Sequence, residues 1–247
     1  MKLVLAEPKY FTDSISIISE MVNEVTLKIY KDKLEIIAMD PANVAMVAFT
    51  LLSSAFAEYK IDKIKDISIN LEQLRQVLKR AKPSDTISLS LDEKKNKLKV
   101  DITGNSKRSF NLALINIDEK EQKVPDLSFP ISITAPTYIF DEAIEDMGVI
   151  SDALSLIAEK NKLTMDSSSN LHSAKVEIQE SDDIEINATD TPITSKYSLE
   201  YLKKMIKTSK LSSKVKIQFN KDYPLRLDYL VKDKMNLTWI LAPRISD

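Results

Sequence analysis

The chain of 247 residues has no cysteine, two glycines (Gly104 and Gly148) and one histidine, His172. The absence of cysteine excludes disulfide bonds, thiol catalysis and cysteine-ligated zinc, and it fits a reducing interior. The sequence also has no P-loop string, no dinucleotide-binding fingerprint and no zinc-ligand spacing. We therefore expect no cofactor, no metal and no catalytic residue.

Long hydrophobic runs are missing as well. The apolar opening Met1–Ala6 stops at Glu7 and Pro8, which is too short for the core of a secretory signal. No uninterrupted apolar run approaches the roughly 20 residues that span a bilayer. We therefore expect a cytoplasmic protein with no membrane partner. The net charge of −2 gives no overall basic signature, so any contact with nucleic acid must come from local clusters of charge.

The second half of the chain repeats the first. The string that begins Leu71-Glu72-Gln73-Leu74 recurs as Leu199-Glu200-Tyr201-Leu202. Ile87 and Val215 are separated by the same offset, and Phe11 and Phe140 by an offset one position longer. A period of about half the chain is typical of two copies of one domain rather than of a solenoid.

The pattern of each half predicts an α+β fold. Apolar and polar residues alternate in strands such as Leu98–Ile102 and Leu225–Tyr229, as in antiparallel sheets covered on one face. Apolar residues at three- and four-residue spacing predict four helices, at about residues 8–23, 71–81, 137–150 and 199–209. We predict domains at residues 1–115 and 128–247, joined by a charged surface linker at residues 116–127.

Several local strings resemble the DNA sliding clamps of the PCNA family, especially the archaeal ones. They are residues 34–44 (LEIIAMDPANV), residues 71–79 (LEQLRQVLK), Tyr223-Pro224-Leu225 and the ending Leu241-Ala242-Pro243-Arg244-Ile245. The resemblance implies two antiparallel clamp domains with two short helices each. Three subunits would form a pseudo-sixfold ring whose helices line a central hole around double-stranded DNA. The protein would be a processivity factor and not an enzyme.

The resemblance also implies that the edge strands of neighbouring subunits pair, because an unpaired edge is a template for a partner's edge. The matching segments are residues 107–114 and residues 171–178. The predicted interface residues are Lys107, Arg108, Phe110, Leu112, Leu171, Ala174, Val176 and Ile178. Without the resemblance, the favoured interpretation of either segment is an ordinary edge strand, protected by Lys107 and Arg108 or by Lys175.

Basic residues follow the second helix of each half, on the face opposite the apolar stripe. Sliding requires phosphate attraction without base readout, and the resemblance places this face toward the DNA. The predicted DNA-binding residues are Arg75, Lys79, Arg80, Lys82, Lys203, Lys204, Lys207 and Lys210. The alternative is a basic face that contacts only solvent. The recurrence of the basic residues at corresponding places in both repeats favours the functional role over this alternative.

The first helix of each half departs from the family pattern. Its exposed side carries Asp13 and Glu20 in the first repeat, and Glu142, Glu145 and Asp146 in the second. These acids repel phosphate where the family is usually basic. A heterotrimer in which sister subunits supply more basic helices explains this departure, and a homotrimer is the alternative.

By resemblance, client proteins insert short apolar motifs into an outer pocket beneath the linker. The predicted pocket residues are Met39, Val44, Met46, Val124, Pro125, Pro224, Ile240, Leu241, Ala242 and Pro243. Methionine suits a pocket that accepts several clients because it repacks easily. The implied partners are DNA polymerase, ligase, flap endonuclease and a clamp loader. For each residue taken alone, plain core packing is the favoured interpretation, and the positional match to the family favours the pocket.

Two other functions stay open. One is a checkpoint-type or other clamp-like scaffold that does not support synthesis. The other is a duplicated α+β enzyme that uses His172, near Ser167–Ser169, with acids elsewhere. A serine–histidine–acid arrangement needs a geometry that this spacing does not supply.

Overall fold

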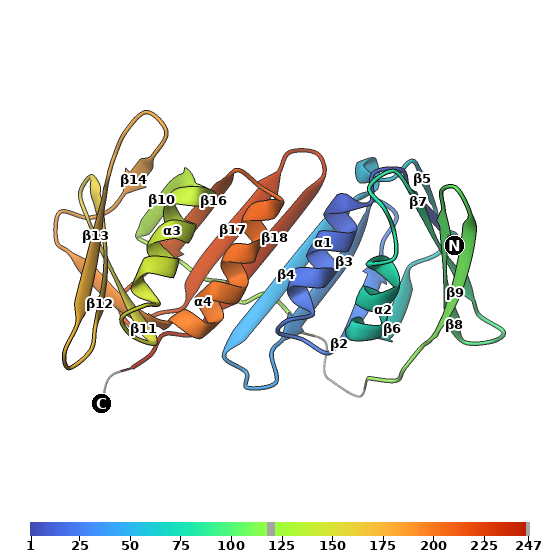
Figure 1. Ribbon diagram of the computed structural model, residues 1–247, viewed down its shortest axis with the longest axis horizontal. Helices are drawn as coiled ribbons and strands as arrows, with labels where there is room; N and C mark the ends of the chain where they lie inside the picture. Colours follow the sequence, from blue (N-terminus) through green and yellow to red (C-terminus); the bar gives the residue numbers. More distant parts are fainter. Residues whose placement is uncertain (118–121, 246–247) are drawn as a thin grey trace. The chain divides into compact units, whose positions relative to one another are not determined.

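The computed structural model describes residues 1–117 and 122–245, so part of the predicted linker lies outside the described residues. The chain divides into two compact units. The first consists of Met1–Pro41, Val47–Val124 and Val231–Leu237, and the second of Ala42–Met46, Pro125–Leu230 and Thr238–Asp247. Figure 1 shows a pair of helices in front of β-sheet in each unit.

The first unit contains two helices, α1 (Lys9–Ile18) and α2 (Leu71–Leu78), and a short 3-10 helix, η1 (Ser53–Ala55). Its strands are β1 (Lys2–Leu5), β2 (Glu24–Ile29), β3 (Lys33–Met39), β5 (Glu58–Lys60), β6 (Lys65–Asn70), β7 (Thr86–Asp92), β8 (Lys97–Thr103) and β9 (Lys107–Ala113). One sheet has the order β5-β1-β7-β8-β9, and β3, β2 and β6 are neighbours in another. Strand β4 (Ala45–Leu52) begins in the second unit and continues in the first.

The second unit contains α3 (Thr137–Met147), α4 (Leu199–Met205) and the 3-10 helix η2 (Ile206–Lys210). Its strands are β10 (Ile131–Pro136), β11 (Ala153–Glu159), β12 (Lys162–Ser168), β13 (Ser173–Gln179), β14 (Glu185–Asn187), β15 (Ile193–Ser198), β16 (Lys214–Phe219) and β17 (Leu225–Val231). Strands β14-β10-β16-β17 are neighbours in one sheet, and β13-β12-β11-β15 form another. Strand β18 (Met235–Leu241) has residues in both units.

Equivalent strand pairs show that the two units repeat one design. In the antiparallel pair β2·β6, Leu27 lies opposite Ile67. In β11·β15, Leu156 lies opposite Ser195. Leu27 matches Leu156 and Ile67 matches Ser195 at the two offsets found in the sequence. The duplication and the predicted antiparallel α+β fold are therefore confirmed.

The helices are shorter than the spacing predicts. Helix α2 starts after Asn70, whose side-chain Oδ1 accepts a hydrogen bond from the Gln73 N–H at 2.9 Å. Helix α4 ends at Met205 and continues as the tighter 3-10 helix η2. Apolar spacing extends past the end of α4, because Ile206 of η2 is also buried.

The apolar stripe of each helix faces the sheet. Leu71, Leu74 and Leu78 of α2 are buried, and so are Leu199, Leu202 and Met205 of α4. The only tryptophan of the chain, Trp239, is buried and donates its indole N–H to Thr208 Oγ1 at 3.0 Å. This bond holds η2 against β18 inside the second unit.

One predicted strand begins later than expected. Leu171 and His172 lie in the turn before β13, and the Leu171 side chain is 86% exposed. Ser169 fixes this turn, since its Oγ accepts from the His172 N–H at 3.1 Å. The prediction that His172 lies in an edge strand is therefore wrong.

Among the described residues, no helix combines the length and the apolar character needed to cross a bilayer. Within the same residues, no group of three or more acidic or histidine side chains is arranged to hold a metal ion.

Candidate nucleic-acid and partner interfaces

The basic residues of the α2 region form two groups, one on the helix itself and one just past its end. Arg75 lies on the middle of the helix and is half-buried, whereas Lys79, Arg80 and Lys82 follow the last helical turn and are exposed. The Arg80 carbonyl accepts a hydrogen bond from Arg108 Nη1 at 2.8 Å. This contact joins the end of α2 to β9, so the backbone that carries these exposed cations is held in place.

Arg75 is already engaged by an acid of its own helix. Its Nε donates to Glu72 Oε2 at 2.6 Å, and its Nη2 donates to Glu72 Oε1. The Gln76 amide donates to the same carboxylate at 3.0 Å. These contacts, with Arg75 first, lower the pKa of Glu72 to about 2, against an ordinary value of 4.5. The positive charge of Arg75 is therefore paired with a negative charge inside the helix layer, the pair of helices in front of the sheet in each unit.

The equivalent helix α4 shows the same division. Lys204 Nζ lies 3.0 Å from Glu200 Oε1, and Lys203 Nζ lies 3.8 Å from Glu145 Oε2 of α3. Lys207 and Lys210 follow on η2, where both are exposed. The predicted basic residues therefore divide into two half-buried lysines on the helix and two exposed lysines beyond its end.

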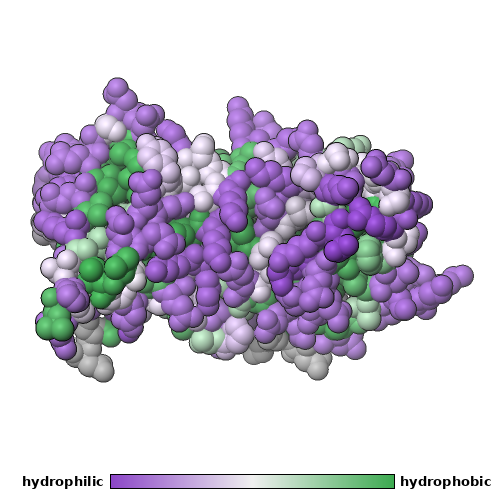
Figure 2. Space-filling model, in the orientation of Figure 1, coloured by the Kyte–Doolittle hydropathy of each residue, from purple (hydrophilic) through white to green (hydrophobic). Residues whose placement is uncertain are grey.

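The acidic residues of the first helices lie at the surface, as the sequence suggests. Glu142, Glu145 and Asp146 of α3 are exposed, and so is Glu20, just after α1. Asp141 is half-buried, and burial raises the pKa of its carboxyl group. Figure 2 shows that hydrophilic side chains cover most of the helix-bearing face of each unit.

The two predicted interface strands are edges of their sheets. Strand β9 is the last strand of its sheet, and β13 is the last strand of another. Phe110 and Leu112 of β9 and Ala174 and Val176 of β13 are partly exposed, and Ile178 is buried. Each edge therefore keeps apolar side chains that its own unit covers only in part.

Arg108 of the predicted interface is held within its own unit. Its Nη2 lies 2.5 Å from Oδ2 of Asp85, a carboxylate that is 3% exposed. The Lys82 backbone N–H donates to the same oxygen at 3.1 Å. This buried carboxylate connects the end of α2 with the edge strand β9.

The residues of the predicted client pocket differ widely in burial. In the second unit, Met46, Ile240 and Leu241 are buried, and Leu241 is 0% exposed. The partly exposed residues of this unit are Val44, Pro224, Ala242 and Pro243, and Pro125 is exposed. In the first unit, Met39 is partly exposed and Val124 is exposed.

An aromatic pair that the sequence reading missed lies beside Pro224. The rings of Phe129 and Tyr223 meet edge to face, with centroids 5.8 Å apart. Both side chains are partly exposed. Each of these aromatics directly precedes a proline, Pro130 or Pro224, and that pattern was the available signal.

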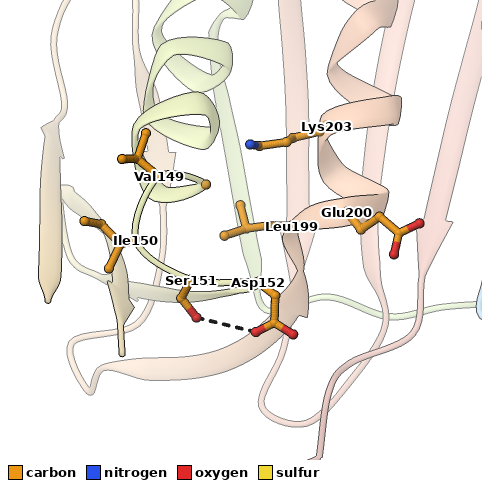
Figure 3. A pocket seen from close by; sticks show the side chains of 8 residues that line it. Val149, Ile150, Ser151, Asp152, Leu199, Glu200 and Lys203 are labelled. Carbon is orange, nitrogen blue, oxygen red and sulfur yellow. Dashed lines mark hydrogen bonds between the residues drawn. The ribbon is translucent and has the colours of Figure 1, made fainter. Parts of the chain in front are cut away.

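A cavity of about 420 Å³ opens between the end of α3 and the start of α4. Figure 3 shows the Lys203 side chain reaching from α4 toward the turn that carries Val149. Ile150, Asp152, Leu199 and Glu200 also line the cavity.

Comparison with known proteins agrees with this geometry. The model of the proliferating cell nuclear antigen N-terminal domain matches residues 5–122, and that of the C-terminal domain matches residues 123–244. The chain belongs to the proliferating cell nuclear antigen family. Two domains of the clamp fold, with four helices over antiparallel sheets, are therefore established for it.

Named relatives match over their whole length. The chain is 30% identical to a DNA polymerase sliding clamp of Thermococcus fumicolans, covering 100% of this chain and 99% of the relative. DNA polymerase sliding clamp 1 of Thermococcus kodakarensis shows the same identity and coverage.

Among solved structures, PCNA from Thermococcus kodakaraensis has a TM-score of 0.90 at 25% identity, covering 98% of this chain and 99% of that one. The PCNA2–PCNA3 complex from Sulfolobus tokodaii has a TM-score of 0.90 at 26% identity, with 99% of each chain covered.

The Glu72–Arg75 pair predicts a defined pH dependence of stability. The lowered pKa of Glu72 means that the folded chain gains stability above the ordinary pKa of 4.5 and loses it as the pH falls toward about 2. We expect the wild type to have a higher midpoint of thermal unfolding than Glu72→Gln at about pH 6, and the difference to shrink across this window. Glu142→Gln, on the exposed face of α3, controls for the loss of one charge. A difference that stays constant from about pH 6 to about pH 2 would contradict the assignment.

Proposed function

We propose that this chain is a DNA polymerase sliding clamp, a processivity factor whose ring keeps replication enzymes on duplex DNA. The observation that carries this function is the match of both clamp domains, in order, together with full-length similarity to named sliding clamps. The family acts without catalysis. The role is topological, because a closed ring retains DNA without tight contact.

The exposed basic residues beyond α2 and α4 support weak contact with the DNA backbone. Lysine and arginine bind phosphates without reading sequence, and such contacts weaken as salt rises. The equivalent positions in both repeats suit a ring that presents similar charges at regular intervals. Double-stranded DNA is therefore the proposed sequence-independent ligand, and the proposed location is the cytoplasm, at the nucleoid.

The edge strands β9 and β13 support ring closure. Both are terminal strands with partly exposed apolar side chains, and joining such edges extends a sheet across subunits. Within these strands, Phe110 and Leu112 would face Ala174 and Val176 of a neighbour, and Ile178 would support that surface from the core. Arg108 acts indirectly, since Asp85 holds it within its own subunit.

Retention on DNA should depend on DNA topology. We expect the loaded protein to stay on closed circular DNA and to run off the same DNA after linearisation, because a ring slides off a free end. The measurement is co-elution with DNA at moderate salt before and after a single cut. Equal retention on circular and linear DNA would contradict encirclement.

The outer surface around Pro224 is the proposed client site. Its part-exposed residues Val44, Ala242 and Pro243, the exposed linker residue Pro125, and the Phe129–Tyr223 pair offer apolar and aromatic contacts within the second unit. Clients would be DNA polymerase, ligase, flap endonuclease and the loader, bound through short apolar motifs. Met46, Ile240 and Leu241 would form the buried floor beneath this surface.

An acidic substitution at this surface should weaken client binding. Val44→Glu or Ala242→Glu places an unpaired charge against an apolar motif, and burying such a charge is costly. We expect the affinity for a client peptide to fall at least about tenfold, or roughly 1.4 kcal/mol. Leu230→Glu, at an exposed leucine of the same unit, is the matched control and should bind normally. Unchanged affinity in both test variants would show that clients bind elsewhere.

We also propose that the ring is a heterotrimer. The exposed acids of α3 oppose the positive charges beyond α4, and sister subunits with more basic first helices would restore the field around DNA. The similarity to a complex of two different PCNA chains is consistent with this arrangement.

Mass measurement distinguishes the mixed ring from a homotrimer. We expect the purified chain to be a monomer or dimer at micromolar concentration and to form a ring only when sister chains are added. A stable trimer of this chain alone that loads and stimulates polymerase would contradict the mixed ring.

A polymerase stimulation assay on primed circular DNA separates this function from a clamp-like scaffold that does not support synthesis. A duplicated enzyme has no support in the geometry, because His172 lies in an exposed turn and its backbone, rather than a catalytic partner, forms the contacts that fix that turn.

A further inference from the structure

The basic residues of the two repeats fall into equivalent positions. Arg75 corresponds to Lys203, Lys79 to Lys207 and Lys82 to Lys210, each at the offset that relates the two helix strings. We propose that Arg75 and Lys203 are positioning residues within the helix layer of each unit. Phosphate contact then belongs to Lys79, Lys82 and Lys210, past the helix ends. This inference rests on the proposed function and divides the predicted DNA-binding set into two roles.

Arg75 is the better fixed of the two positioning residues. Two parallel hydrogen bonds join its guanidinium to the Glu72 carboxylate, and a fork of this kind is stronger and more directional than a single ion pair. The charge of Glu20, just after α1, adds to its stabilisation. A phosphate would have to displace Glu72 before it could bind Arg75.

Lys203 reaches the neighbouring helix in the second unit. Its ammonium group lies 3.8 Å from Glu145 of α3. Its Cε and Nζ also lie over Gly148, where a Cβ atom would come within 2.2 Å of both. Gly148 therefore leaves the space that Lys203 occupies at the end of α3. Helix α3 has no basic residue in its own last turn, and a cation at this end is favourable because the helix dipole is negative there.

The lysines past the helix ends have different surroundings. Lys79 and Lys82 follow α2, Lys210 ends η2, and all three are exposed. Among the described residues, none of these three forms an ion pair with an acid. A phosphate can approach them without first breaking an internal salt bridge.

The decisive experiment compares two double variants that remove the same charge from equivalent positions. Lys82→Gln with Lys210→Gln tests the phosphate contacts, and Arg75→Gln with Lys203→Gln tests the positioning residues. Binding of the assembled ring to a duplex of about 30 base pairs is followed by fluorescence anisotropy over a range of salt concentrations. Thermal unfolding of each variant is measured in parallel.

We expect the Lys82/Lys210 variant to reduce the slope of log K against log salt by about 0.9 for each lost contact, with little change in unfolding. The Arg75/Lys203 variant should keep the wild-type slope and unfold at a lower temperature. Equal loss of slope in the two variants would overturn the division of roles.

Gly148→Ala gives a second test with no change of charge. Gly148 has a φ of −69°, which alanine adopts readily, and the atoms displaced are the flexible end of Lys203. We expect the protein to fold normally and the slope of its salt dependence to become steeper, because the displaced Lys203 becomes available to phosphate. An unchanged slope would show that the contact with Glu145 and Gly148 is not what keeps Lys203 from DNA.

The same data separate this inference from the proposed function. A wild-type ring that shows no salt-dependent binding to the duplex would overturn both. A wild-type ring with a steep slope that both double variants reduce equally would overturn the division of roles and leave the clamp function standing.

Discussion

One backbone hydrogen bond fixes the start of the second helix in each unit, and the placement of the basic residues depends on it. The Leu71 N–H donates to the Asn23 carbonyl at 2.8 Å, and the Leu199 N–H donates to the Asp152 carbonyl at 2.9 Å. In both units the acceptor lies just before the strand that pairs with the one leading into the helix. The ladder register therefore sets the helix start, and the helix start sets which residues face away from the sheet.

The apolar stripe then fixes the rotation of each helix. Leu74 and Leu202 are 0% exposed at equivalent positions, and their burial favours a single orientation because exposing either would return a large apolar side chain to water. Arg75 and Lys203 follow these leucines directly, so both lie within the helix layer. Lys79 and Lys207 lie a turn later, where the helices end.

The charge pattern of the helix layer follows from these two constraints. Acids on the helices neutralise the bases that lie within the layer, as in Glu72–Arg75 and Glu145–Lys203. What remains for phosphate is Lys79, Lys82 and Lys210 past the helix ends, where the dipoles of α2 and α4 also favour positive charge. A clamp that slides needs weak, reversible attraction, and a partly self-neutralised helix layer provides it.

The sequence by itself determined the duplication, the antiparallel α+β class and the family, because repeated apolar spacing and local strings are properties of the chain order. It also identified the basic positions of both repeats. Only the tertiary structure decided which of them form ion pairs within their own unit. The packing of α3 against α4, for example, brings Lys203 to Glu145 and over Gly148. The burial of Met46 and Leu241 was likewise hidden, because the same apolar residues suit a core or a pocket until the neighbouring strands are placed. Contacts between residues far apart in the chain depend on register and packing, and a linear pattern does not encode either one locally.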